Sequence, residues 1–145
     1  MKAVVQRVLS ATLTVNGETV SEIGKGLVVF LGVGKGDDIK DCQYFIKKLP
    51  TLRIFEDENG KTNLSVLDVG GEILLVSQFT LFADTSHGNR PSFLGAELPE
   101  RADELYKFVG AELEKSLPVK YGIFGADMKI KQINDGPFTV IMQSR

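Results

Sequence analysis

Alternating hydrophobic stretches joined by a short turn open the chain and constrain its fold. The dipeptide Asn16-Gly17 lies between residues 11–15 and 18–23. Asn-Gly is typical of the two-residue turn of a β-hairpin, because both residues tolerate positive φ. The two stretches are therefore expected to pair as antiparallel strands. Local pairings of this kind favour an antiparallel or mixed sheet over a parallel nucleotide-binding sheet.

The rest of the chain follows with strands and two helices. We expect strands at residues 3–8, 11–15, 18–23, 27–33, 72–82, 119–124, 127–133 and 138–142, and extended structure at 52–55. Asp37 or Asp38 is expected to cap a first helix, which Pro50 ends. Pro99 is expected to open a second helix that runs to about Leu117. The prediction is an α+β fold with a mixed or antiparallel sheet and two main helices.

Bulk properties point to one domain over residues 1–145, with a hydrophobic content of 43%. No apolar run approaches the roughly 20 residues of a membrane helix, and the N-terminus lacks a signal-peptide pattern. A single cysteine favours a reducing compartment, so we expect a cytoplasmic protein. The net charge of −2 means that any nucleic-acid contact must come from a local basic patch.

Several kinds of catalytic chemistry lack the residues that they need. His87 is the one candidate base for a histidine triad, and its polar, glycine-flanked surroundings indicate a solvated loop residue. Cys42 falls on the apolar side of the first helix, where core filling is the better interpretation. One cysteine and one histidine cannot dominate a zinc site, so no metal or cofactor is expected. The glycines at 32, 34 and 36 fit neither nucleotide-binding motif and indicate a plain strand-to-helix turn.

The run Ser77-Gln78-Phe79-Thr80 places polar groups in a hydrophobic stretch. Buried polar groups are unfavourable there unless they form hydrogen bonds or serve a functional site. A regular strand would put Ser77 and Phe79 on one face and Gln78 and Thr80 on the other. If all of them serve one pocket, the strand must bulge or end near Gln78, which would free backbone N–H groups for an oxyanion hole. Alternatively, the hydroxyls bond to neighbouring backbone and Gln78 faces solvent.

The run Asn134-Asp135-Gly136-Pro137 has two interpretations as well. Asn-Asp-Gly is a good hairpin turn, and a proline after it can begin an edge strand. By residue pattern alone, the turn is the better interpretation. A glycine before proline also tolerates unusual backbone geometry, which suits a site built from main chain.

The two runs together resemble the D-aminoacyl-tRNA deacylase family, and further blocks in the same order extend the resemblance over the whole length. These blocks are residues 3–8, 24–27, 52–55, 63–66, 77–84, 90–93, 124–128 and 134–139. The resemblance implies a D-aminoacyl-tRNA deacylase-like fold and a cytoplasmic homodimer without a cofactor. It also implies hydrolysis of the ester that joins a D-amino acid, or glycine, to the 3′ end of tRNA.

The same resemblance assigns roles to residues. Ser77, Gln78, Phe79 and Thr80 line the active site, and Gly136-Pro137, with a cis bond, enters it from the opposite subunit. Its carbonyls would hold the substrate ammonium, so that an L side chain collides with backbone while a D side chain does not. Supporting positions are Arg7, Phe124, Met128 and Asn134, with Arg7 supporting the cis arrangement across the interface. Candidate phosphate contacts are Arg90, Lys129 and Lys131.

The mechanism stays open between two routes. In one, Thr80 is a covalent nucleophile, but nothing near it in the sequence supplies a base. In the favoured route, the tRNA 2′-OH activates water while N–H groups near Gln78 and Phe79 hold the oxyanion. Two rival functions are a relative with a trans Gly136-Pro137 bond and relaxed chirality, and a non-catalytic nucleic-acid binder.

Overall fold

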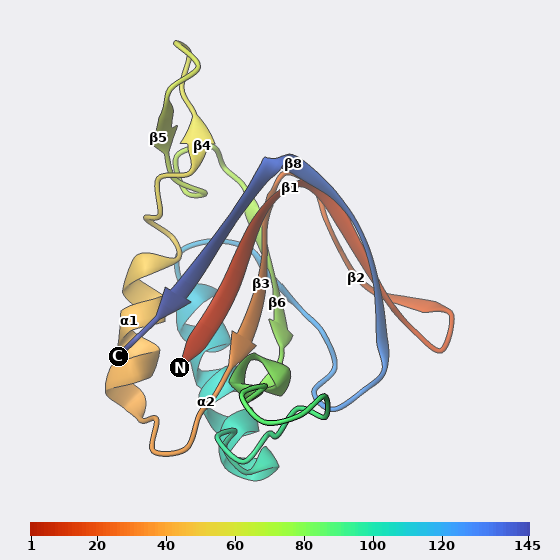
Figure 1. Cartoon of the computed structure of the whole chain (residues 1–145). Helices are drawn as coiled ribbons and strands as arrows, with labels where there is room; N and C mark the ends of the chain where they lie inside the picture. The colour runs from red at the N-terminus through yellow and green to blue at the C-terminus, as the bar shows by residue number, and fades with distance from the viewer.

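A six-stranded mixed sheet flanked by two α-helices forms the body of the protein (Figure 1). The computed structural model describes residues 1–145. In chain order the elements are β1 (Lys2–Val15), β2 (Glu18–Ile23), β3 (Gly26–Gly32), α1 (Ile39–Lys48), β4 (Phe55–Glu56), β5 (Thr62–Leu64), β6 (Glu72–Ser77), the 3₁₀ turn η1 (Phe79–Phe82), α2 (Pro99–Leu113), β7 (Val119–Tyr121) and β8 (Met128–Gln143). The predicted α+β class is confirmed.

The long strand β1 organises the sheet, because it has three antiparallel partners. Its first half pairs with β3, its second half pairs with β2, and β8 runs along its other edge. β6 and then β7 extend the sheet from β3 in parallel register. The predicted hairpin at Asn16-Gly17 is confirmed, with both residues at positive φ. β1 and β8 bend together, so the second half of β1 folds over β3 and β6 (Figure 1).

The interpretation of residues 134–137 as a hairpin turn is wrong. β8 runs straight through them in one direction, and the two predicted strands on either side are parts of this one element. Gln6 lies opposite Thr139, whereas Val8 lies opposite Asn134, so the residues between them leave the ladder as a bulge. The physical reason is β1, which is also one strand instead of two and offers a partner on both sides of the bulge.

Four further boundaries differ from the predictions. β6 ends at Ser77, five residues before the expected Phe82, and η1 follows it. α2 ends at Leu113 instead of about Leu117, where the Ser116 hydroxyl donates a hydrogen bond to the last helical carbonyl. β7 stops at Tyr121 instead of Phe124, although the Gly122 N–H still donates to the Leu75 carbonyl at 3.0 Å. Of the extended structure expected at 52–55, only Phe55 belongs to a strand, the short β4. The first helix begins after Asp38, as predicted, and Asp38 caps it with its carboxylate.

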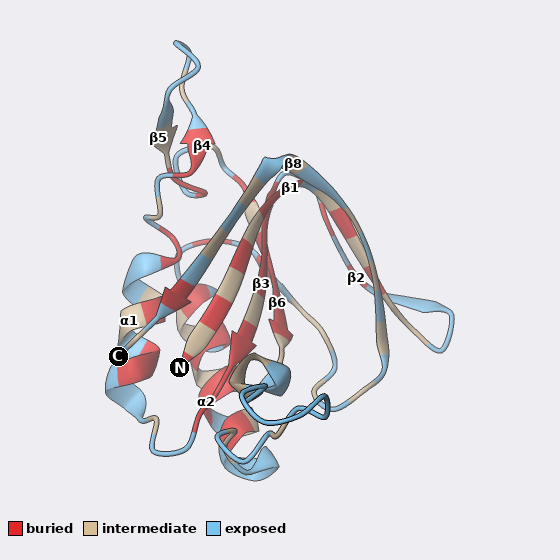
Figure 2. Ribbon diagram, viewed as in Figure 1, coloured by how far each residue is buried: buried red, intermediate tan, exposed pale blue.

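Two hydrophobic clusters lie on opposite faces of β3 and β6. The larger one fills the space between the sheet and the two helices, and it contains Cys42, as predicted. Burial raises the pKa of the Cys42 thiol to about 11. The smaller cluster includes Val28 and Leu74 and is covered by the second half of β1. β3 and β6 are therefore hydrophobic on both faces, which explains their nearly continuous apolar runs (Figure 2).

No helix of the protein combines the length and the apolar character that crossing a membrane requires.

Candidate functional site

The chain breaks out of the sheet where the polar run begins. Ser77 is the last residue of β6, and the backbone N–H of Gln78 still donates to the carbonyl of Leu31 at 2.9 Å. Residues 79–82 then close into the turn η1. Gly32 makes this turn possible, because a Cβ there would lie 2.7 Å from the Gln78 carbonyl oxygen. β6 therefore ends just before Gln78, as expected if the polar residues of this run serve a single pocket.

The turn leaves backbone donors at its start. The N–H groups of Leu81 and Ala83 bond back to the carbonyls of Gln78 and Thr80. The N–H groups of Phe79 and Thr80 open the turn, and residues in this position have no partner within it. Two adjacent backbone donors are therefore available at the end of β6, which is the arrangement an oxyanion needs.

A cavity of about 290 Å³ lies beside this turn. Ten of its fourteen lining residues are hydrophobic. The lining residues are Leu31, Val33, Val76, Ser77, Gln78, Phe79, Ala102, Tyr106, Phe124, Gly125, Ala126, Asp127, Met128 and Ile130. The structure thus brings together five of the predicted site residues, Ser77, Gln78, Phe79, Phe124 and Met128, in one largely apolar pocket. Its only carboxylate, Asp127, is paired with Lys129 at 2.9 Å.

Thr80 lies outside the cavity lining and is exposed. Its hydroxyl oxygen accepts a hydrogen bond of 2.5 Å from the side-chain amide of Gln78. A donor directed at this oxygen lowers its electron density, so the contact does not activate Thr80 as a nucleophile. His87 is exposed and contacts Ser86, in agreement with a solvated loop residue.

Sequence reasoning missed two pocket residues on α2, Ala102 and Tyr106. Tyr106 is 3% exposed, and its hydroxyl donates to the Leu75 carbonyl at 2.7 Å. Its ring packs against Phe124 with the centroids 6.1 Å apart. Burial raises the pKa of Tyr106, so its hydroxyl stays a donor. The available signal was a polar aromatic residue at helical spacing from Ala102 and Val109, on a helix face that is otherwise apolar.

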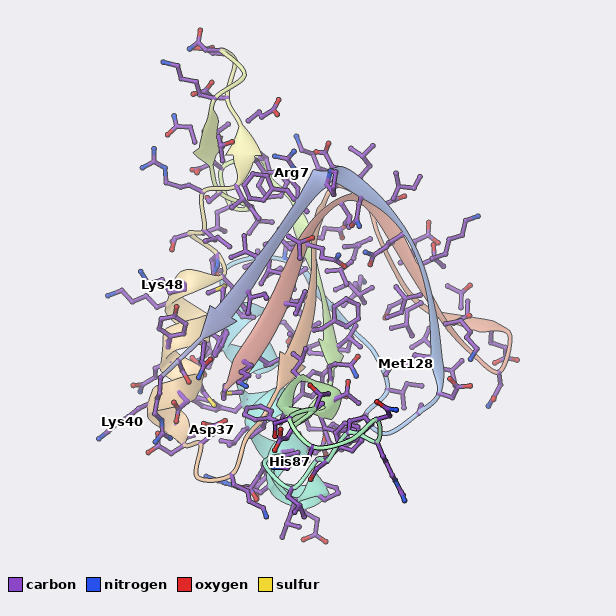
Figure 3. All side chains as sticks on the ribbon, in the orientation of Figure 1. Arg7, Asp37, Lys40, Lys48, His87 and Met128 are labelled. Carbon is purple, nitrogen blue, oxygen red and sulfur yellow. The ribbon has the colours of Figure 1, made fainter.

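The remaining predicted residues lie at the far end of the same strands. Arg7 marks the bend of β1 and β8, whereas the Met128 and His87 labels lie at the opposite end of the sheet (Figure 3). Arg7 is paired with Leu27, Ala3 with Leu31, and Leu31 in turn with Ser77. Four residues of strand and two strand spacings give roughly 16 Å between the positions of Arg7 and Ser77. Gly136-Pro137 is therefore remote from the pocket of its own chain.

The bulge at Gly136 is held from inside by Arg7, which is 4% exposed. The Arg7 Nε donates to the Asp135 carbonyl at 3.0 Å and lies 3.1 Å from the Asp135 carboxylate. Its Nη1 donates to the Ile54 carbonyl at 2.6 Å, and its guanidinium lies 5.0 Å from the Phe138 ring centroid. These contacts join Arg7 to the bulge of its own chain.

The Gly136-Pro137 peptide bond is cis, and both residues are exposed. Gly136 has a φ of +135°, and a Cβ there would lie 2.8 Å from the Phe138 nitrogen. Only glycine fits this backbone. Asn134, the last paired residue before the bulge, accepts a hydrogen bond of 3.0 Å from the Gln132 side chain.

Solved structures with this architecture define the class of protein. One, named c-Myc DNA Unwinding Element Binding Protein, is 44% identical with a TM-score of 0.95, covering 100% of this chain and 99% of that one. Another, described as a probable eukaryotic D-amino acid tRNA deacylase, is 16% identical with a TM-score of 0.82 over 97% of both chains. The fold is that of the D-aminoacyl-tRNA deacylases, which are ester hydrolases.

Sequence comparison leads to the family. The family model of D-Tyr-tRNA(Tyr) deacylase matches residues 4–143. A D-aminoacyl-tRNA deacylase of Persephonella marina is 54% identical over 145 residues, which cover 100% of this chain and 99% of the relative. A D-aminoacyl-tRNA deacylase of Thermodesulfovibrio yellowstonii is 51% identical over 146 residues and the full length of both. The chain belongs to the D-Tyr-tRNA(Tyr) deacylase family, as its sequence motifs indicated.

Proposed function

We propose that this chain hydrolyses the ester of D-aminoacyl-tRNA, and of tRNA mischarged with glycine, and so releases the free amino acid and tRNA. The observation that carries the proposal is the end of β6, where the free N–H groups of Phe79 and Thr80 adjoin an apolar pocket. The apolar walls suit the terminal adenosine, while Ser77 and Gln78 provide the polar end at which the ester lies. The N–H groups stabilise the oxyanion that forms when water attacks the ester carbonyl.

The active site in this proposal needs two copies of the chain. Roughly 16 Å of sheet separates the strand positions of Arg7 and Ser77. Gly136-Pro137 therefore reaches a pocket only in a second chain. A two-fold symmetric dimer supplies this contact twice, because each copy gives its bulge and receives the other's. Ile133 and Ile141, exposed by 54% and 77% on β8, support a partner on this strand.

Gly136-Pro137 serves in this dimer as the filter for chirality. Its two carbonyls accept hydrogen bonds from the substrate ammonium, which fixes the α-carbon between the ammonium and the ester. An L side chain then points into backbone, whereas a D side chain or the hydrogen of glycine points into open space. Main chain suits this task because it cannot move aside by changing rotamer. The Arg7 contacts to Asp135 and Ile54 support a bulge that holds its position.

For the chemical step we favour activation of water by the tRNA 2′-OH over a Thr80 nucleophile. The amide of Gln78 donates to the Thr80 hydroxyl, which favours a positioning role for both side chains. An aminoacyl ester is already reactive, so positioning and oxyanion stabilisation are sufficient to accelerate its hydrolysis. The whole chain acts as one catalytic domain in the cytoplasm, where charged tRNA is used.

The test uses purified protein and tRNA charged with D-tyrosine, L-tyrosine or glycine, with loss of the ester followed over time. We expect fast hydrolysis of the D-tyrosyl and glycyl esters and no effect on the L-tyrosyl ester. Hydrolysis of both the D-tyrosyl and the L-tyrosyl ester would refute the main-chain filter and favour a relaxed-chirality deacylase. Binding of the charged tRNA without hydrolysis of any ester would refute the proposed enzymatic activity and favour a non-catalytic nucleic-acid binder. Analytical ultracentrifugation of the same sample tests the dimer.

A further inference from the structure

Two exposed aromatic rings form a pair beside the pocket. The ring centroids of Phe79 and Phe93 lie 5.1 Å apart, with their planes at 71°. Phe79 is 56% exposed and Phe93 is 36% exposed. Neither ring belongs to a hydrophobic core cluster. The pair therefore presents apolar ring surface to solvent for a reason other than core packing.

The backbone fixes Phe93 in place. Asp84 and Ser92 exchange two backbone hydrogen bonds of 2.7 and 2.9 Å, which close the exposed loop before Phe93. After Phe93, the Lys35 N–H donates to the Gly95 carbonyl at 3.0 Å. The loop and η1 lie together on the exposed surface at the end of β6 (Figure 2). A ring that is already ordered loses little conformational entropy when a ligand stacks on it.

We propose that Phe79 and Phe93 form a stacking subsite for the nucleobase that precedes the terminal adenosine of tRNA. The inference rests on the proposed function, because it takes the terminal adenosine to occupy the pocket. Phe79 belongs both to the pocket lining and to the aromatic pair, so the polynucleotide leaves the pocket past these rings. Proteins bind unpaired nucleic-acid ends by stacking bases on aromatic side chains.

Charge in the same loop fits this occupant. Arg90 is exposed in the segment that Asp84 and Ser92 close, so its guanidinium is available to the phosphate that links the last two nucleotides. Stacking uses the face of a base and not its hydrogen-bonding edge, so the subsite accepts any base. The enzyme thereby gains affinity for a tRNA end over a free aminoacyl nucleoside without selecting one tRNA.

The experiment compares two small substrates with the intact protein. One is D-tyrosine esterified to adenosine, and the other is D-tyrosine esterified to the 3′ end of the dinucleotide cytidylyl-adenosine. We expect wild-type kcat/KM to be about tenfold higher for the dinucleotide ester, the size of effect that one stacked base gives. Phe93→Ala brings this ratio close to one, and Phe93→Trp restores it. Leu94→Ala is the control, because Leu94 is 80% exposed next to Phe93 but has no ring.

The outcomes separate the inference from the function on which it rests. Equal kcat/KM values for the two esters with wild-type protein, or an unchanged ratio in Phe93→Ala, would overturn the stacking subsite and leave the deacylase standing. Hydrolysis of neither ester would overturn both. A Phe93→Ala protein that becomes monomeric and loses both activities in proportion would show that a second copy of the chain covers the rings, which also overturns the subsite.

Discussion

Replacing Arg7 with methionine removes a buried cation while keeping most of the apolar stem. The guanidinium donates to the carbonyls of Asp135 and Ile54 at 3.0 and 2.6 Å. Arg7→Met removes both hydrogen bonds, and it also removes the ion pair with the Asp135 carboxylate. The bulge that carries Gly136 then loses its contacts with the Arg7 side chain.

The contacts give the size of the effect. Each hydrogen bond from a charged donor contributes about 1.5–3 kcal/mol. The Asp135 side chain is 35% exposed, so its ion pair adds less than about 1 kcal/mol. Relief from burying the guanidinium offsets part of the loss. We expect Arg7→Met to lower the free energy of unfolding by about 3–4 kcal/mol, which corresponds to about 10 °C in Tm for a chain of this size.

Urea unfolding followed by circular dichroism, at matched protein concentrations, measures this loss. The control is Arg53→Met, an exposed arginine that bonds to the Asn63 carbonyl, for which we expect less than about 1 kcal/mol. Deacylation of D-tyrosyl-tRNA is measured below the Tm of both variants, and only Arg7→Met is expected to reduce it. If both variants unfold within about 1 kcal/mol of wild type, the Arg7 contacts do not hold the bulge and the reasoning fails.

Three other predictions address the helix, the turn and the chemistry. The Arg145 guanidinium holds the pKa of Asp41 well below its usual range, so the stabilisation is present above the unfolded pKa of about 4 and is lost as pH falls further. Asp41→Asn is therefore expected to be less stable than wild type at pH 7, with the difference in Tm shrinking towards pH 2; a constant difference would contradict this. Gly32→Ala is expected to abolish deacylation, since its Cβ would meet the Gln78 carbonyl at 2.7 Å, while the control Gly24→Ala, whose Cβ would lie no nearer than 3.8 Å to any atom, retains activity. Thr80→Ala is expected to lower kcat only modestly, whereas a 2′-deoxy tRNA end abolishes hydrolysis; the reverse result would establish Thr80 as the nucleophile.

Local sequence signals determined much of the fold. Asn16-Gly17 fixes a hairpin because its two residues accept positive φ in any surroundings. Asp38 begins α1 because a carboxylate satisfies the free N–H groups of the first turn within a few residues. Of the site, Ser77 to Phe79, Phe124 and Met128 were identified from motifs, and the structure places them in one pocket.

What depends on partners distant in sequence was decided only by the tertiary structure. Residues 134–137 carry a good turn sequence, yet they continue β8, because β1 pairs with the chain on both sides of the bulge. β6 ends at Ser77 because the last ladder bond goes to Leu31 and the missing side chain of Gly32 leaves room for η1. Tyr106 reaches the pocket because α2 packs across β6. Periodicity and turn preference act between neighbours in sequence, whereas strand length, the end of β6 and the separation of the two halves of the site depend on which strand lies alongside.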